Sequence, residues 1–174
     1  MKYVKWLFVV TLLSSLCAFV EKDKPTGGLS VGDVAPDFKI ETTSLLAGIP
    51  QKTFKLSAEK GKYVLVSFWA SYDAQSRMQN VSISNVLRAS GNKNVEMVSV
   101  SFDEYRSICS ETIRNDQIVA SVCSWQAKGT RSDIYATYRL GRGLINYLID
   151  GNGIIIAKNI DAANLSAYLK TLKA

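Results

Sequence analysis

The 174-residue chain contains no histidine and only three cysteines. The absence of histidine excludes Ser-His-Asp and Cys-His nucleophile pairs, histidine-based zinc motifs and a histidine proton switch near neutral pH. Any catalysis must therefore rely on cysteine, carboxylate, lysine, tyrosine or backbone groups. No residues have the spacing of a metal site, and we expect neither a metal nor any other cofactor.

Runs of basic residues are absent as well. The formal net charge is +6, but Lys2 and Lys5 belong to an N-terminal leader, so the remainder carries 19 basic and 15 acidic residues, a net charge of +4. These charges are scattered along the sequence, and no stretch of five or more basic residues occurs. The sequence therefore lacks the charge pattern of a nucleic-acid-binding protein, and we expect no nucleic-acid partner.

The N-terminus has the layout of a secretory signal peptide. Residues 1–5 carry two lysines, residues 6–20 are free of charge, and the polar residues 21–24 follow. The uncharged run of 15 residues is shorter than the roughly 20 residues that span a bilayer as a helix. We therefore predict that residues 1–20 form a signal peptide and that the protein is exported to a bacterial periplasm or cell envelope.

Cys17 leaves a second interpretation of the leader open. Bacterial lipoprotein signals are cut just before a cysteine that then receives lipid, but they favour a small residue before it, and Leu16 is large. Ordinary cleavage near residues 15–17 is the alternative. We expect contact with a membrane only through the leader or through a lipid anchor on Cys17.

The rest of the chain predicts one α/β domain. Residues 21–31 are rich in Lys, Gly, Pro and Ser and read as a tether, which leaves residues 32–174 as the domain. Strand and helix patterns alternate, and Gly151-Asn152-Gly153 is a strong hairpin turn. The expected strands cover residues 38–42, 53–56, 62–69, 95–100, 118–123, 145–150 and 154–157, and the expected helices cover residues 73–90, 104–115, 131–139 and 162–172.

Three segments resemble the thioredoxin-like superfamily: VGDVAPDF at residues 31–38, VLVSFWAS at 64–71 and YLIDGNGI at 147–154. Within it, the chain is similar to the exported thiol-disulfide oxidoreductases grouped with alkyl hydroperoxide reductase and thiol-specific antioxidant proteins. The resemblance covers about residues 31–174. It implies a central mixed β-sheet flanked by helices, with an N-terminal β-hairpin extension.

The sequence departs from that family where the chemistry should occur. In active relatives an aromatic residue and then Cys-x-x-Cys follow the segment matching 64–71, and the helix N-terminus stabilises the first thiolate. The matching positions here are Asp73 and Ser76, and neither side chain can exchange disulfides. Asp73 can instead cap the helix, which contributes about 1 kcal/mol.

A second departure lies at Leu144, where the family usually has a cis-proline facing the cysteine pair. A cis bond before a non-proline residue costs about 3 kcal/mol, so we expect a trans peptide and a reshaped substrate edge. The peroxidase pattern Pro-x-x-x-Thr-x-x-Cys is absent too.

Cys109 and Cys123 are the other two cysteines, and three arrangements remain open for them. A structural disulfide would close a loop of about 15 residues and stabilise the fold by roughly 3 kcal/mol. Alternatively, both are buried free thiols. The third arrangement is a redox pair that has moved from the usual site.

The residues around the altered motif form a candidate binding surface: Tyr72, Asp73, Gln75 and Arg77. The competing interpretation is helix capping and a solvated first turn. Asp103 and Glu104 are expected to start the next helix rather than to bind a metal, and Asp150 is expected to cap the hairpin turn.

These observations predict an exported thioredoxin-like protein that is redox-inactive at the usual site. It would act as a binding or structural module for an unidentified envelope protein or peptide. The alternative is a thiol redox protein that uses Cys109 and Cys123. Loss of enzymatic activity is the favoured hypothesis; if the protein is active, it is a thiol-disulfide oxidoreductase.

Overall fold

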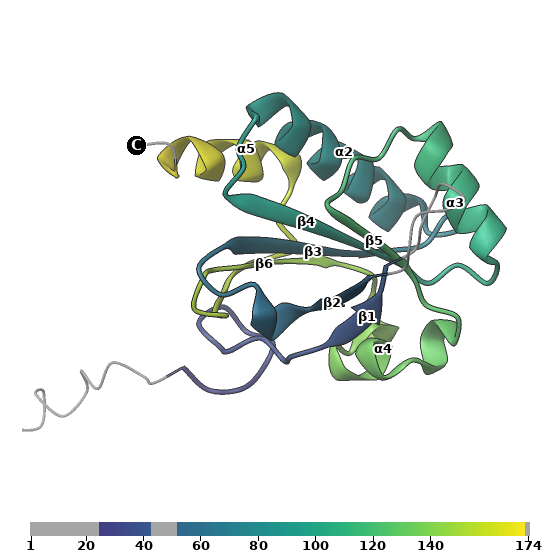
Figure 1. Ribbon diagram of the computed structural model, residues 1–174, viewed down its shortest axis with the longest axis horizontal. Coiled ribbons are helices and arrows are strands. Elements are labelled where there is room, and N and C mark those ends of the chain that lie inside the picture. The colour runs from purple at the N-terminus through teal and green to yellow at the C-terminus, as the bar shows by residue number, and fades with distance from the viewer. Residues whose placement is uncertain (1–24, 43–51, 173–174) are drawn as a thin grey trace, which may run out of the picture.

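The computed structural model describes residues 25–42 and 52–172 (Figure 1). The predicted signal peptide and Cys17 lie outside these residues. The strands are β1 (Lys39–Glu41), β2 (Thr53–Lys55), β3 (Tyr63–Trp69), β4 (Val95–Ser101), β5 (Val122–Trp125), β6 (Asn146–Ile149) and β7 (Ile155–Lys158). The helices are α2 (Ala74–Ser90), α3 (Arg106–Asn115), α4 (Asp133–Thr137) and α5 (Ala162–Thr171), with short 3-10 turns η2 (Leu56–Ala58), η3 (Gly129–Arg131) and η4 (Leu140–Arg142).

A mixed five-stranded sheet forms the centre of the domain, in the order β5-β4-β3-β6-β7. The central strand β3 pairs in parallel with β4 and antiparallel with β6. It is almost wholly buried because its apolar side chains point to both faces of the sheet. The predicted mixed sheet is confirmed. The N-terminal hairpin is confirmed too, because β1 and β2 pair antiparallel, with Ile40 opposite Phe54.

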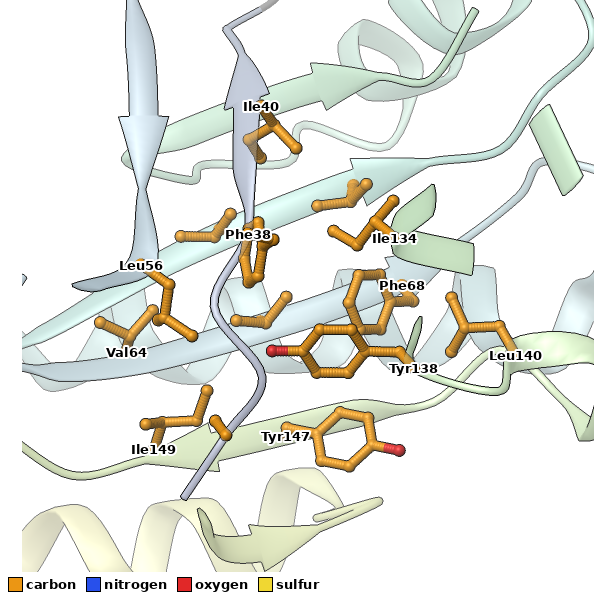
Figure 2. Packing of buried hydrophobic residues seen from close by; sticks show 14 of the residues in the cluster. Phe38, Ile40, Leu56, Val64, Phe68, Ile134, Tyr138, Leu140, Tyr147 and Ile149 are labelled. Carbon is orange, nitrogen blue, oxygen red and sulfur yellow. The ribbon is translucent and has the colours of Figure 1, made fainter. Parts of the chain in front are cut away.

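Helices and the hairpin cover opposite faces of this sheet, as Figure 1 shows. On one face, α2 and α5 pack over a cluster that includes Leu65, Ile83 and Leu165. On the other face, α4 and the β1–β2 hairpin cover an aromatic core. Figure 2 shows Phe68 beside Tyr138, with ring centroids 5.0 Å apart.

The strand directions bring four loops to one edge of the sheet, here called the carboxyl edge. Because β3, β4 and β5 are parallel, their carboxyl ends meet there, and β6 starts there because it runs antiparallel to β3. The carboxyl edge consists of residues 70–73, 102–105, 126–132 and 139–145. Ligands of open α/β sheets bind at such edges.

The hairpin turn after β6 lies at the opposite edge. Asp150 Oδ1 accepts hydrogen bonds from the backbone N–H of Asn152 at 2.9 Å and of Ile154 at 2.8 Å. The predicted turn and its cap are confirmed.

Most predicted elements differ from the structure by one or two residues at their ends, and two lose four residues of their predicted range. The strand expected at 118–123 starts only at Val122, because the Ser84 hydroxyl bonds both the N–H and the carbonyl of Val119 and holds that segment against α2. The helix expected at 131–139 is reduced to the five residues of α4, and Arg139 then adopts a positive φ of 51°. No helix in the described part of the chain is long and apolar enough to cross a membrane.

Candidate functional site

The two residues at the positions of the expected cysteines form hydrogen bonds that cap the start of α2. Asp73 is the N-cap, and its carboxylate accepts a hydrogen bond from the Ser76 N–H at 3.2 Å. Ser76 is buried, and its hydroxyl donates to the Asp73 carbonyl at 3.2 Å and accepts from the Ala70 N–H at 3.4 Å. The predicted capping role of Asp73 is confirmed.

A buried carboxylate supports the loop before this helix. Asp103 is 1% exposed, and one of its oxygens accepts hydrogen bonds from the backbone N–H and the hydroxyl of Ser71. The other oxygen accepts from the Ser101 hydroxyl at 2.8 Å. The expected helix start at Asp103 and Glu104 is wrong, because α3 begins only at Arg106. Asp103 instead ties the ends of β3 and β4 together.

The candidate binding residues lie at the start of α2, and their exposure and partners differ. Tyr72 is 68% exposed and Gln75 is exposed. Arg77 turns toward α3, where its Nε and Nη2 donate to the two carboxylate oxygens of Asp116, each at 2.7 Å. This pairing lowers the pKa of Asp116 and raises that of Arg77.

Tyr72 lies at the carboxyl edge, in the loop between β3 and α2. Desolvation, and then the neighbouring Tyr135 and the carboxylates of Asp103 and Asp73, raise the pKa of its hydroxyl. Tyr135 belongs to α4, and its ring packs against Phe102, with centroids 5.2 Å apart. A cavity of about 270 Å³ lies elsewhere, next to Val64 and Ile149 at the opposite edge.

Leu144 lies at the carboxyl edge, two residues before the start of β6, and is buried. The peptide before it is trans, as expected, because the described residues contain no cis peptide. The neighbouring Ile145 carbonyl accepts a hydrogen bond from the Phe68 N–H at 3.2 Å, which fixes this segment against β3.

The two described cysteines lie in an apolar cluster away from the start of α2. Cys109 of α3 is fully buried with Trp69 and Ile113, and Cys123 of β5 packs against the same cluster. Both thiols are free in the structure. Burial raises the pKa of Cys109 to about 11 and that of Cys123 to about 12. Very little of either thiol is therefore ionised at neutral pH, and the thiolate is the nucleophile.

In residues 25–42 and 52–172, the Cys, Asp and Glu side chains form no group of three or more that could hold a metal ion.

The sheet order, the helix that begins at the end of β3 and the flanking helices define a thioredoxin-like fold. Residues 31–158 match the AhpC/TSA family, and the chain belongs to that family.

Two solved structures show the same arrangement. A thioredoxin-like protein from Parabacteroides distasonis is 35% identical, with a TM-score of 0.67 over 84% of this chain and 99% of that chain. The thioredoxin domain of a thiol-disulfide oxidoreductase from Bacteroides vulgatus is 25% identical, with a TM-score of 0.68 over 83% of this chain and 99% of that domain.

A curated relative agrees with these structures. The thiol-disulfide oxidoreductase ResA of Oceanobacillus iheyensis is 27% identical over 125 residues, which is 72% of this chain. The match spans 62% of the length of that relative. Family membership in the thiol-disulfide oxidoreductase type is thus supported by sequence as well as by fold.

Proposed function

We propose that this chain is an exported thioredoxin-like protein that does not exchange disulfides at the start of α2 and that acts as a binding module in the cell envelope. One observation carries the proposal: Asp73 and Ser76 occupy the first turn of α2, while both described thiols are buried in another cluster. The export step rests on the signal-peptide pattern of residues 1–20.

The chemistry of disulfide exchange supports the loss of activity. Exchange requires a thiolate that attacks a disulfide sulfur and a second thiol that resolves the mixed disulfide. Asp73 supplies a carboxylate and Ser76 a hydroxyl, so neither step can start at α2. The Ser76 N–H, which would help to stabilise a thiolate at this helix end, already donates to the Asp73 carboxylate.

The rigidity of the surrounding loop supports a binding role. Asp103 fixes Ser71 through two hydrogen bonds, and the N-cap fixes Asp73. Tyr72 lies between these anchors and remains exposed. A rigid, exposed aromatic side chain is a favourable contact residue because few rotamers are lost on binding.

Reduction of insulin disulfides by dithiothreitol tests the loss of activity. We expect the wild-type protein to give the rate of dithiothreitol alone, and catalysis above that rate would overturn the proposal. Binding is tested by capture from envelope extract. A partner should be retained by the wild type and by Lys93→Ala at the opposite edge, and lost with Tyr72→Ala; equal capture by all three would contradict the assigned surface.

A second candidate function is thiol redox chemistry at Cys109 and Cys123. Both thiols border the cluster around Trp69, and the proximity of Cys109 contributes to the raised pKa of Cys123. The same raised pKa values oppose this function, because a reactive pair needs a readily formed thiolate.

A further inference from the structure

Basic side chains gather on the segment between β5 and β6. Lys128, Arg131, Arg139 and Arg142 are all exposed, and Asp133 is the single acidic residue among them. The segment thus holds a net charge of +3 within a protein of net charge +6. These four side chains are called the basic cluster below.

The basic cluster has no carboxylate partner within the described residues. Ion pairs elsewhere in the described residues join Lys55 to Asp37, Lys62 to Glu59 and Glu96, and Arg77 to Asp116. None of the four side chains of the basic cluster makes an ion pair or a hydrogen bond with another described residue. Their positive charge is therefore available to a partner.

The fold holds this segment close to α4. The turns η3 and η4 both pack against α4, so all four basic side chains come from the turns and loops beside one short helix. In Figure 1, α4 lies below the sheet at the end where α3 is found. The ring of Tyr135 in α4 packs against Phe102, with centroids 5.2 Å apart, and Phe102 lies with Tyr72 at the carboxyl edge. The basic cluster belongs to the same edge, so it lies on the same side of the sheet as the surface assigned to partner binding.

The chemistry of the cluster points to carboxylates. Three of its four members are arginines, whose planar guanidinium forks bind carboxylates through two parallel hydrogen bonds. We propose that the basic cluster, together with Tyr72, binds an acidic segment of a partner protein. The inference rests on the proposed binding function and names the class of partner.

Two other anionic partners fit the surface less well. Duplex binding commonly uses about six to ten phosphate contacts, more than four side chains supply. A helix that lies on a membrane presents exposed apolar residues to the lipid. The apolar residues interleaved with the basic cluster, Ile134, Leu140 and Leu144, are instead buried in the domain.

Fluorescence anisotropy with a labelled peptide of alternating glutamate and serine tests the inference. We expect saturable binding to the full chain, and Arg139→Glu together with Arg142→Glu should weaken it by about tenfold, the sum of two exposed ion pairs. The matched control is Lys60→Glu with Lys93→Glu, which makes the same charge change on exposed residues of the opposite edge. This control should change the affinity by less than about twofold.

A second pair of substitutions guards against a folding artefact. Arg139 has a positive φ, so Arg131→Glu with Arg142→Glu leaves that position untouched and should give the same loss. Circular dichroism reports whether each variant is folded.

Several results would overturn the inference: no binding of the peptide by the wild type, equal losses in cluster and control variants, or equal binding of a glutamine-serine peptide. Binding of phosphatidylglycerol vesicles or DNA with no binding of the glutamate peptide would overturn it as well. The insulin assay separates this outcome from the proposed function. A wild type that reduces insulin refutes the inactive site, whereas an inactive wild type that ignores the acidic peptide refutes only the partner class.

Discussion

A thiol enzyme needs a thiol and, at the same place, surroundings that stabilise the thiolate. In this protein the first turn of α2 and the cluster between α3 and β5 each provide only one of these two. The first turn of α2 has a helix N-terminus and an exposed neighbour, Tyr72, but its side chains are Asp73 and Ser76. The second region has the thiols of Cys109 and Cys123, but an apolar environment surrounds them.

This comparison indicates that a cysteine is a good nucleophile where its surroundings stabilise the thiolate. At a helix N-terminus, unpaired N–H groups favour the anion and lower its pKa. In the α3–β5 cluster, desolvation raises the pKa of Cys109 to about 11 and of Cys123 to about 12. Cys109 and Cys123 therefore pack as small apolar residues.

The largest effect is expected from placing two thiols in the first turn of α2. The double substitution Asp73→Cys with Ser76→Cys should raise the rate of insulin reduction at least about tenfold over the wild type, because the helix end stabilises the new thiolate. The matched control, Asp73→Ser with Ser76→Ala, should give no gain. A folded double-cysteine variant without activity would show that the loss does not lie in these two residues.

The second prediction concerns the buried thiols. Near pH 8, Cys109 and Cys123 should react with iodoacetamide at least about a hundredfold more slowly than free cysteine, because so little thiolate is present. Mass spectrometry of the two peptides measures each rate. Concentrated guanidinium should restore ordinary rates, and fast labelling of the folded protein would contradict the account.

The third prediction concerns the hydrogen bonds that Asp103 accepts at the carboxyl edge. Asp103→Ala leaves Ser71 and Ser101 without their acceptor, and it should lower the free energy of unfolding by about 3 kcal/mol. Urea unfolding measures the change from the shift in midpoint. The exposed neighbour Glu104 serves as the control, and Glu104→Ala should change the free energy by less than about 0.5 kcal/mol.

The smallest effect is expected from the ion pair between Arg77 and Asp116. Because this pair is partly exposed and screened by solvent, it should contribute only about 0.5 to 1 kcal/mol in a double-mutant cycle with Arg77→Ala and Asp116→Asn. Arg114→Ala on the neighbouring helix is the control, since Arg114 is exposed and makes no ion pair with a described residue.

The pH dependence of this pair has a defined sign. Arg77 lowers the pKa of Asp116 below 3.8, so the folded state favours the ionised carboxylate. The contribution is therefore fully present above that value and is lost as the pH falls through the pKa of the folded state. Unfolding curves of the wild type and Arg77→Ala should converge in acid, and a constant difference at every pH would contradict the assignment.

Periodicity predicted the fold well because most strands are apolar, and the central strand at 62–69 most clearly so. It failed where a distant side chain decides the conformation. The backbone at Val119 is held by Ser84 of α2, 35 residues away, and no local pattern reveals that contact.

The candidate site was predicted in part. The cap at Asp73 and the exposed Tyr72 followed from the helix start. Asp103 was missed because a carboxylate after a strand resembles a helix cap, and its partner Ser71 lies 32 residues earlier. The basic cluster was missed because its members are spaced along the sequence, and no local pattern shows that η3 and η4 both pack on α4.

The proposed loss of activity requires that Cys109 and Cys123 do not form a working redox pair. The most direct test equilibrates the full chain in dithiothreitol and glutathione buffers between about −300 and −100 mV. Acid stops the exchange, an alkylating agent in concentrated guanidinium then labels every free thiol, and mass spectrometry identifies the cysteine peptides. We expect Cys109 and Cys123 to be alkylated at every potential. A transition in which both become protected together at one midpoint would contradict it.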